Sequence, residues 1–170
     1  MNLYLRLLIL LIKSYWKPRL DLMDKSILKF YVLPNDLDIN MHMNNGRYNS
    51  IMDLGRADIM LRTGLLRIIY RKKWFGLVGS IHTRFRRPLK PFQKYELHSQ
   101  VIYWDDKWIW IEQKIFSKGK LISSALVQTI IRSKSKNIAS PELMELMGFY
   151  YPSPEITEEI KHLQRFEPLE

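Results

Sequence analysis

Apolar residues recur at every third or fourth position between residues 48 and 63, and this spacing predicts one long helix with one face in a core. Asn44 or Asn45 is a suitable N-cap because its side chain can accept a hydrogen bond from an unpaired backbone amide of the first turn. Gly64 is a suitable stop, since glycine adopts the left-handed conformation that ends many helices. Gly55 on the apolar face would let another element approach closely.

Apolar and polar residues alternate in five other segments, which predicts strands there. One precedes the helix and four follow it: residues 26–33, 75–87, 94–104, 108–116 and 121–132. The last three are joined by short turn sequences around residues 105–106 and 117–119, so we expect antiparallel hairpins. One helix against a mainly antiparallel sheet is an α+β fold.

The two ends of the chain look helical and divide it into three parts: residues 1–24, 25–135 and 136–170. Near the C-terminus, Ser140 is the expected N-cap of a short helix with Pro141 at its first position, and another helix is expected after Pro154.

The N-terminal part is apolar and basic, and four of its leucines share a helical face: Leu3, Leu7, Leu10 and Leu11. Its longest wholly apolar run, residues 7–12, is shorter than the roughly 20 residues that span a bilayer. Two interpretations stay open. The helix packs on the domain or on a partner, or it lies on a membrane as a basic interfacial helix.

Composition narrows the classes of function. The chain has 170 residues, which suits one domain, and its net charge of +10 favours anionic partners such as phosphorylated ligands, acidic lipids or nucleic acid. Cysteine is absent, which excludes disulfides and thiolate nucleophiles and fits a cytoplasmic protein. The four histidines lack metal-ligand spacing, and the scattered basic residues form no nucleic-acid-binding motif. We therefore expect neither a metal nor a nucleic-acid partner.

The loop before the long helix carries the candidate chemistry: Asp36, Asp38, Asn40 and His42. A helix N-terminus presents unpaired amides and the positive end of the helix dipole, and both favour negative charge. The simpler interpretation is that these side chains only order the loop through Asx-turns. Of the two carboxylates, Asp36 is the better structural candidate.

The run from Asp36 to Asn45, with Tyr48, Asp53 and Arg56 after it, resembles the signature of hotdog-fold acyl thioesterases. It is close to the loop of plant-type acyl-ACP thioesterases, and its Asp-x-Asp opening is similar to the 4-hydroxybenzoyl-CoA thioesterase family. Residues 81–88, 91–92 and 104–106 and the apolar N-terminus resemble proteins called thioesterase superfamily member six-like. The resemblance implies five or six antiparallel strands wrapped around the central helix, in a homodimer or homotetramer. It further implies hydrolysis of acyl-CoA or acyl-ACP to acid and thiol, without a cofactor.

The resemblance also implies roles for single residues. Asp38 would act as general base or as nucleophile, with His42 and Asn40 orienting water or moving the proton. Backbone amides near Asn45 and Gly46 would stabilise the oxyanion. The basic series Arg84, Arg86, Arg87 and Lys90 is the candidate for binding CoA phosphates or an acidic carrier protein, and strand alternation places Arg84 and Arg86 on one face. The simpler interpretation of this series is a solvated strand face with salt bridges.

Two alternatives remain open. Asp53 on the helix is a rival catalytic carboxylate, although it could simply pair with Arg56 three residues later. The protein could also be a non-catalytic hotdog protein that binds acyl thioesters or serves as an interaction module at a membrane.

Overall fold

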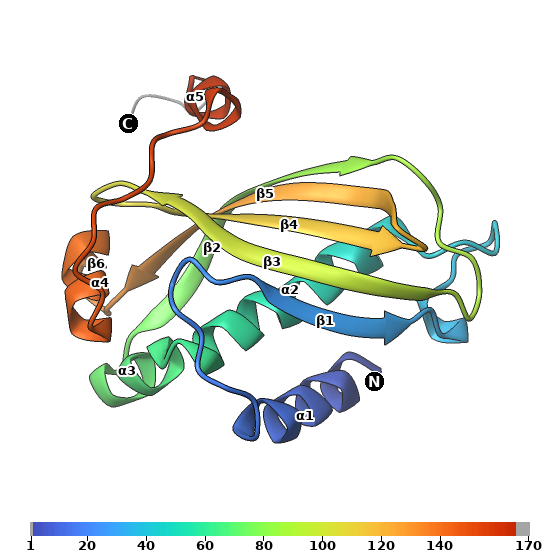
Figure 1. The fold of residues 1–170 in the computed structure, drawn as a ribbon, viewed down its shortest axis with the longest axis horizontal. Coiled ribbons are helices and arrows are strands. Elements are labelled where there is room, and N and C mark those ends of the chain that lie inside the picture. Colours follow the sequence, from blue (N-terminus) through green and yellow to red (C-terminus); the bar gives the residue numbers. More distant parts are fainter. Residues whose placement is uncertain (1, 166–170) are drawn as a thin grey trace.

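The computed structural model describes residues 2–165, in which one curved antiparallel sheet wraps around a long helix, α2 (Asn45–Arg62), as Figure 1 shows. The strand order is β1-β3-β4-β5-β2, and β6 pairs with β5. The strands are β1 (Ser26–Tyr31), β2 (Phe75–Phe85), β3 (Lys94–Trp104), β4 (Ile109–Ser117), β5 (Lys120–Arg132) and β6 (Asn137–Ile138). The predicted α+β class and antiparallel hairpins are therefore confirmed.

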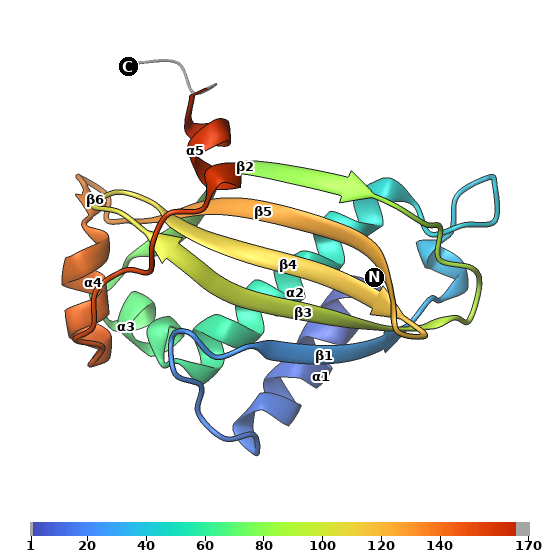
Figure 2. The same ribbon diagram turned by 45° about the horizontal axis from the view of Figure 1, so that its top comes forward.

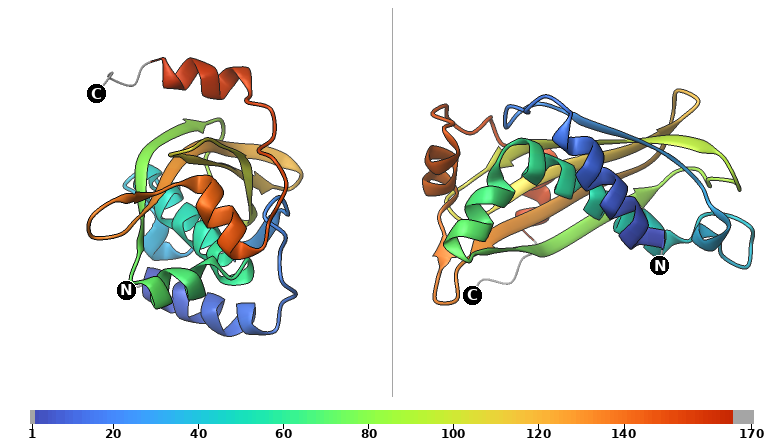
Figure 3. Two further views of the ribbon diagram at one scale, coloured as in Figure 1. Left: turned by 90° about the vertical axis from the view of Figure 1, so that its left-hand side faces the viewer. Right: turned by 90° about the horizontal axis from the view of Figure 1, so that it is seen from below.

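The other helices lie outside the sheet or at its ends (Figures 1 and 3). They are α1 (Asn2–Tyr15), the 3-10 turn η1 (Pro34–Asp36), α3 (Leu65–Lys72), α4 (Ser140–Met147) and α5 (Glu158–Gln164). The end view in Figure 3 shows α2 inside the curl of the sheet, with α1 on the side of α2 that the sheet leaves open.

α2 touches the sheet most closely at Gly55. A Cβ atom there would collide with the side chains of Ser99 on β3 and Gln113 on β4, so the predicted close approach is confirmed. Gln113 is fully buried, and its amide nitrogen donates to Ser99 Oγ (2.8 Å) and to the Met52 carbonyl (2.9 Å). These hydrogen bonds fix the height of α2 above the sheet.

The ends of α2 are as the sequence predicts. The Asn44 side chain accepts a hydrogen bond from the Gly46 amide (2.9 Å), and Gly64 follows the helix with φ of 84°. Asn44 fixes where the helix begins and Gly64 fixes where it ends, and the beginning of the helix follows directly on the loop with the candidate chemistry.

α1 packs on α2 through the predicted leucines, except one. Leu10 is buried, and Leu3 and Leu7 pack against the same core, but Leu11 is 41% exposed, so its assignment to the packed face is wrong. The helix ends at Tyr15 and not near residue 24, and residue 1 lies outside the described part. A polar anchor holds its end, since fully buried Asp58 of α2 accepts from Ser14 Oγ at 2.8 Å.

The C-terminal helices appear where the sequence predicts them, with one shift. Ala139, not Ser140, is the N-cap of α4, and the Ser140 amide donates instead to the Asp106 carbonyl (3.0 Å) in the β3–β4 turn. Since Ser140 is buried against this turn, tertiary packing sets the start of the helix. Residues 166–170 of the predicted tail lie outside the described residues.

Candidate active site

The loop between β1 and α2 borders a pocket of about 300 Å³ at one end of the molecule. In Figure 2 this end also carries the β4–β5 turn and the segment that leads into β3. The pocket brings together five of the predicted site residues: Asp38, Asn40, His42, Asn45 and Arg86. Two others, Gly46 and Arg84, are not among its lining residues.

Asp38 is half-buried and its two carboxylate oxygens have different surroundings. Oδ1 accepts hydrogen bonds from the backbone amides of Asn40 (2.9 Å) and His42 (3.4 Å), which is the Asx-turn of the simpler interpretation. Oδ2 accepts no hydrogen bond from residues 2–165. One oxygen therefore orders the loop, and the other has no hydrogen-bond donor within residues 2–165.

The turn that carries Asp38 is fixed on both sides. The Asp38 amide donates to the His42 carbonyl (2.9 Å), and the Met43 amide donates to the Leu89 carbonyl (2.9 Å). Met41 in this turn has φ of 57°, a left-handed conformation that a side chain disfavours. Such strain persists only where surrounding contacts enforce it, and it is common at functional sites.

The first turn of α2 supplies one open amide. The Gly46 amide is occupied by the Asn44 side chain, whereas the Asn45 amide donates to no acceptor in the described part of the chain. Asn45 also lines the pocket. Of the two amides that the sequence suggested, only that of Asn45 is available to a developing oxyanion.

Tyr48 is a pocket residue that the sequence did not assign to the site. Its ring is buried and makes an edge-on contact with Phe85, with ring centroids 5.1 Å apart. Burial raises the pKa of the Tyr48 hydroxyl and the Asp38 charge adds to the rise, while a hydrogen bond with the Leu89 backbone opposes it. Tyr48 occupies the first apolar position of the helix stripe, so the pattern alone assigned it to the core.

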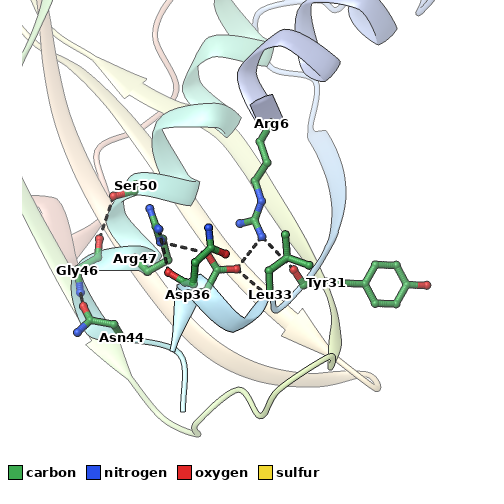
Figure 4. Close-up of polar contacts among 9 residues, drawn as sticks. Arg6, Tyr31, Leu33, Asp36, Asn44, Gly46, Arg47 and Ser50 are labelled. Atoms are coloured by element: carbon green, nitrogen blue, oxygen red, sulfur yellow. Dashed lines mark hydrogen bonds and ion pairs between the residues drawn. The ribbon is translucent and has the colours of Figure 1, made fainter. Parts of the chain in front are cut away.

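Asp36, two residues before Asp38, has a structural role (Figure 4). It is buried, and its carboxylate contacts the Arg6 guanidinium at 2.6 Å, the Arg47 Nε at 3.1 Å and the Leu33 amide at 2.9 Å. The two arginines come from α1 and α2, so Asp36 joins both helices to the loop.

The two arginines of the predicted phosphate site lie in different surroundings. Arg84 is exposed, and its guanidinium lies 3.5 Å from Glu159 of α5, whereas Arg86 follows β2 and lines the Asp38 pocket. Strand β2 ends at Phe85, earlier than residue 87, and beyond it the amides of Arg86 (2.8 Å) and Arg87 (3.2 Å) both donate to the Ile122 carbonyl.

Asp53 forms the predicted pair with Arg56 on α2 and is exposed on its other side. Both residues border a second cavity, of about 270 Å³, between α2 and the sheet. Its other walls are almost entirely apolar and include Ile59, Val78 and Ile111. Within residues 2–165, no three His, Cys, Asp or Glu side chains are placed to share a metal ion.

The comparisons of the sequence with known proteins agree on one family. Residues 32–162 match the thioesterase-like superfamily. The chain is 31% identical over 155 residues to the protein THEM6 of Danio rerio, covering 89% of this chain and 75% of that protein. It is 29% identical over 126 residues to a probable thioesterase of Saccharomyces cerevisiae, covering 72% of this chain and 55% of the yeast protein.

Solved structures agree on the fold. The YbaW probable thioesterase from Escherichia coli superposes with a TM-score of 0.66 at 22% identity, covering 70% of this chain and 93% of that one. A Staphylococcus aureus protein solved in complex with CoA superposes with a TM-score of 0.67 at 18% identity, covering 85% of this chain and 96% of that one. A 1,4-dihydroxy-2-naphthoyl-CoA thioesterase from Synechocystis superposes with a TM-score of 0.64 at 10% identity, covering 73% of this chain and 95% of that one.

Proposed function

The chain belongs to the thioesterase-like superfamily and has the hotdog fold, and from this premise we propose that it hydrolyses an acyl-CoA thioester, with Asp38 as the catalytic carboxylate. The observation that carries the proposal is that Asp38 and Asn45, whose backbone amide is open, line the same pocket. One Asp38 oxygen has no hydrogen-bond donor among the described residues, and the Asn45 amide stands at the positive end of α2. Thioester hydrolysis needs a group that accepts a proton from the attacking water and a hydrogen-bond donor that stabilises the negative charge on the carbonyl oxygen. Both must lie next to the same carbonyl.

In the proposed reaction, Asp38 Oδ2 takes a proton from water while the water oxygen attacks the thioester carbonyl. The carbonyl oxygen gains negative charge, which the Asn45 amide stabilises; one such donor lowers the barrier by about 3 to 4 kcal/mol. The intermediate then expels the thiolate, which receives the proton, and the acid leaves. In the alternative route an Asp38 oxygen attacks the carbonyl carbon, the C–S bond breaks and the thiolate leaves. Water then hydrolyses the resulting anhydride, which releases the acid, restores the Asp38 carboxylate and supplies the proton that the thiolate takes up.

His42 and Asn40 support this chemistry from the same pocket. Because the His42 backbone is bonded to Asp38, its imidazole stays close to the proposed path of the proton. The Asn40 amide side chain can orient the water or the carbonyl. The apolar cavity beside Asp53 suits the acyl chain, since its walls offer hydrocarbon contacts.

We assign the homodimer interface to β2. This strand is an edge of the sheet, 11 residues long, and four of its apolar side chains are more than 40% exposed: Phe75, Leu77, Val78 and Phe85. A long apolar edge is prone to pair with a second strand. Light scattering after size exclusion should show a dimer for the wild type and a monomer for Val78→Lys. A monomeric wild type would refute the assignment.

We assign the outer face of α1 to a membrane surface containing anionic lipid. Seven of its large apolar side chains are exposed, and so is Trp16, which directly follows the helix: Tyr4, Leu5, Leu8, Ile9, Leu11, Ile12 and Tyr15. Lys13 and Arg19 supply positive charge close to them in the chain. No helix within residues 2–165 is long and apolar enough to cross a bilayer. With cysteine absent, peripheral binding from the cytoplasmic side is the location that we propose.

Vesicle co-sedimentation tests this surface. The wild type should sediment with vesicles containing phosphatidylserine and less with neutral vesicles, and Leu8→Glu/Ile12→Glu should abolish the binding. Equal sedimentation of the wild type and the variant would contradict the assignment.

Thiol release from a panel of acyl-CoA and aryl-CoA substrates tests the enzymatic proposal. We expect turnover by the wild type and a loss of at least about a hundredfold in Asp38→Ala, as removal of a general base produces. The circular dichroism spectrum should be unchanged, because Asp38 lies in a loop. Tight binding of acyl-CoA without thiol release would favour the non-catalytic alternative.

A further inference from the structure

A second, larger concave surface lies beside the Asp38 pocket, on the outer face of the sheet. It has a volume of about 1160 Å³ and is formed by the start of β3, the segment before it and the β4–β5 turn. We call it the basic groove because five cationic side chains line it: Arg87, Lys90, Lys94, Lys118 and Lys120.

The charge of the basic groove is uncompensated. Its one carboxylate, Glu96, is already shared by Lys29 (3.3 Å) and His98 (3.3 Å). None of the five cations forms an ion pair with any residue in the range 2–165. All five are exposed, so the groove offers several cations to one polyanionic ligand.

Aromatic side chains add a second feature. The Phe116 ring stands 4.9 Å from the His98 ring on the outer face of the sheet, and both line the groove. Phe92 also lines it, is 68% exposed and has φ of 60°. The Phe92 amide donates to the Val32 carbonyl (3.0 Å), which enforces the unfavourable backbone. A strained, exposed aromatic beside cations fits a planar, charged ligand.

Hydrogen bonds hold the two sides of the groove together. Gln93 accepts from the Lys90 amide (3.0 Å), and its own amide donates to Ser117 Oγ (2.8 Å) at the end of β4. The cations of the segment before β3 therefore keep a fixed position relative to those of the β4–β5 turn. A preorganised set of cations loses less entropy when it binds phosphate groups.

We propose that the basic groove binds the phosphorylated adenosine end of CoA. Arg87, Lys90, Lys94, Lys118 and Lys120 contact its phosphates, and the adenine stacks on the aromatic side chains. This assignment rests on the proposed thioesterase function and selects CoA over an acyl carrier protein. A concave groove with aromatic side chains suits a base and its phosphates better than it suits the surface of a folded protein.

The position of the groove supports the assignment. Arg87 and Pro88 line both the groove and the Asp38 pocket, so the two hollows adjoin. In CoA the pantetheine arm separates the thioester from the nucleotide. With the thioester at Asp38, this arm can pass Pro88 and leave the nucleotide in the groove. The groove therefore takes over the role that the sequence suggested for Arg84.

The β4–β5 turn allows a clean test with a matched control. Lys118→Glu/Lys120→Glu reverses two charges that flank Gly119 in the exposed turn. Lys134→Glu/Lys136→Glu reverses two charges that flank Ser135 in the exposed β5–β6 turn, at the opposite end of the sheet in Figure 1. The two double variants have the same net charge, so they separate a local contact from general electrostatic attraction.

Direct binding of adenosine 3′,5′-bisphosphate, measured by calorimetry, is the first readout. We expect binding to the wild type and to the Lys134/Lys136 variant, and at least about a tenfold weaker affinity in the Lys118/Lys120 variant, as loss of charged hydrogen bonds produces. Equal weakening in both double variants, or no binding to the wild type, overturns the proposal. This readout does not need turnover, so it stands even if the protein hydrolyses no thioester.

Kinetics with two substrates is the second readout. The Lys118/Lys120 variant should raise KM for an acyl-CoA at least about tenfold, with kcat nearly unchanged, and should leave the same acyl group on pantetheine unaffected. A KM that rises equally for both substrates overturns the nucleotide assignment. An effect seen only with acyl-ACP also overturns it, because the occupant is then an acidic protein.

Discussion

Asp36 and Asp38 lie two residues apart in one loop, yet their surroundings are opposite. Asp36 is buried, and its charge is neutralised by Arg6 and Arg47, which belong to two different helices. Asp38 is half-buried beside a pocket, forms no ion pair within residues 2–165, and accepts hydrogen bonds from two backbone amides with one of its oxygens. The first carboxylate stabilises the position of the loop, and the second is left available for chemistry.

This difference shows how one short motif supports both structure and function. The oxygens of the buried Asp36 carboxylate are occupied by two arginines and the Leu33 amide, and these contacts fix the backbone that carries Asp38. The Asn44 amide donates to the Asp36 carbonyl (2.9 Å), so the start of α2 is fixed by the same residue. The comparison predicts that changes at Asp36 reduce stability and changes at Asp38 reduce activity.

The largest expected effect on stability is that of Asp36→Ala. It leaves the Arg6 guanidinium, which is 8% exposed, without its carboxylate, and removing one partner of a buried ion pair costs about 3 to 5 kcal/mol. Urea unfolding followed by fluorescence gives the change directly. Asp38→Ala is the control and should lose less than about 1.5 kcal/mol, the value of an ordinary hydrogen bond. Equal losses in the two variants would remove the distinction between the carboxylates.

A smaller effect is expected for Asn44→Ala. It removes the cap of α2 and should reduce the free energy of unfolding by about 1 kcal/mol. Because the cap fixes the first turn, which presents the Asn45 amide, kcat should fall as well, although less than in Asp38→Ala. Asn44→Ser, which keeps a capping oxygen, should restore both quantities. Failure of serine to restore either would show that Asn44 acts in another way.

The smallest effect concerns alkaline stability. Burial raises the pKa of Tyr48 in the folded protein, so above about pH 10 the unfolded chain loses this proton first. Stability from Tyr48 is therefore present below pH 10 and decreases as the pH rises towards the folded-state pKa. Tyr48→Phe should lose less stability than the wild type between about pH 9 and 11. If the free energy of unfolding changed equally with pH in Tyr48→Phe and in the wild type, Tyr48 would have the same pKa in the folded and the unfolded protein.

The sequence predicts much of the fold because its signals are local. The cap at Asn44, the glycine at 64 and the alternation in the strands depend on neighbouring residues, and each lies where it was expected. The same reasoning fails at Ser140, since the β3–β4 turn and not the local cap preference sets the start of α4.

The site is less accessible to this reasoning because its parts come from distant segments. The resemblance indicated Asp38, Asn40 and His42, and the structure places them along one pocket. The sequence indicated Arg87 and Lys90 as anion-binding residues together with Arg84 and Arg86. Spacing could not show that Arg84 lies apart from Arg86, or that residues 87–94 and the β4–β5 turn form one groove. Both depend on where β2 ends and on the β4–β5 turn lying at the same end of the sheet as the start of β3.

The central claim is that Asp38, and not another carboxylate of the motif or of α2, activates the attack on the thioester. Steady-state thiol release by Asp38→Asn and Asp53→Asn, measured on the same acyl-CoA, compares the two candidates at equal charge. We predict that kcat falls at least about a hundredfold in Asp38→Asn. Asp53→Asn should remain close to wild type, because Asp53 already pairs with Arg56. A fully active Asp38→Asn together with an inactive Asp53→Asn would transfer the catalytic role to the helix and contradict this account.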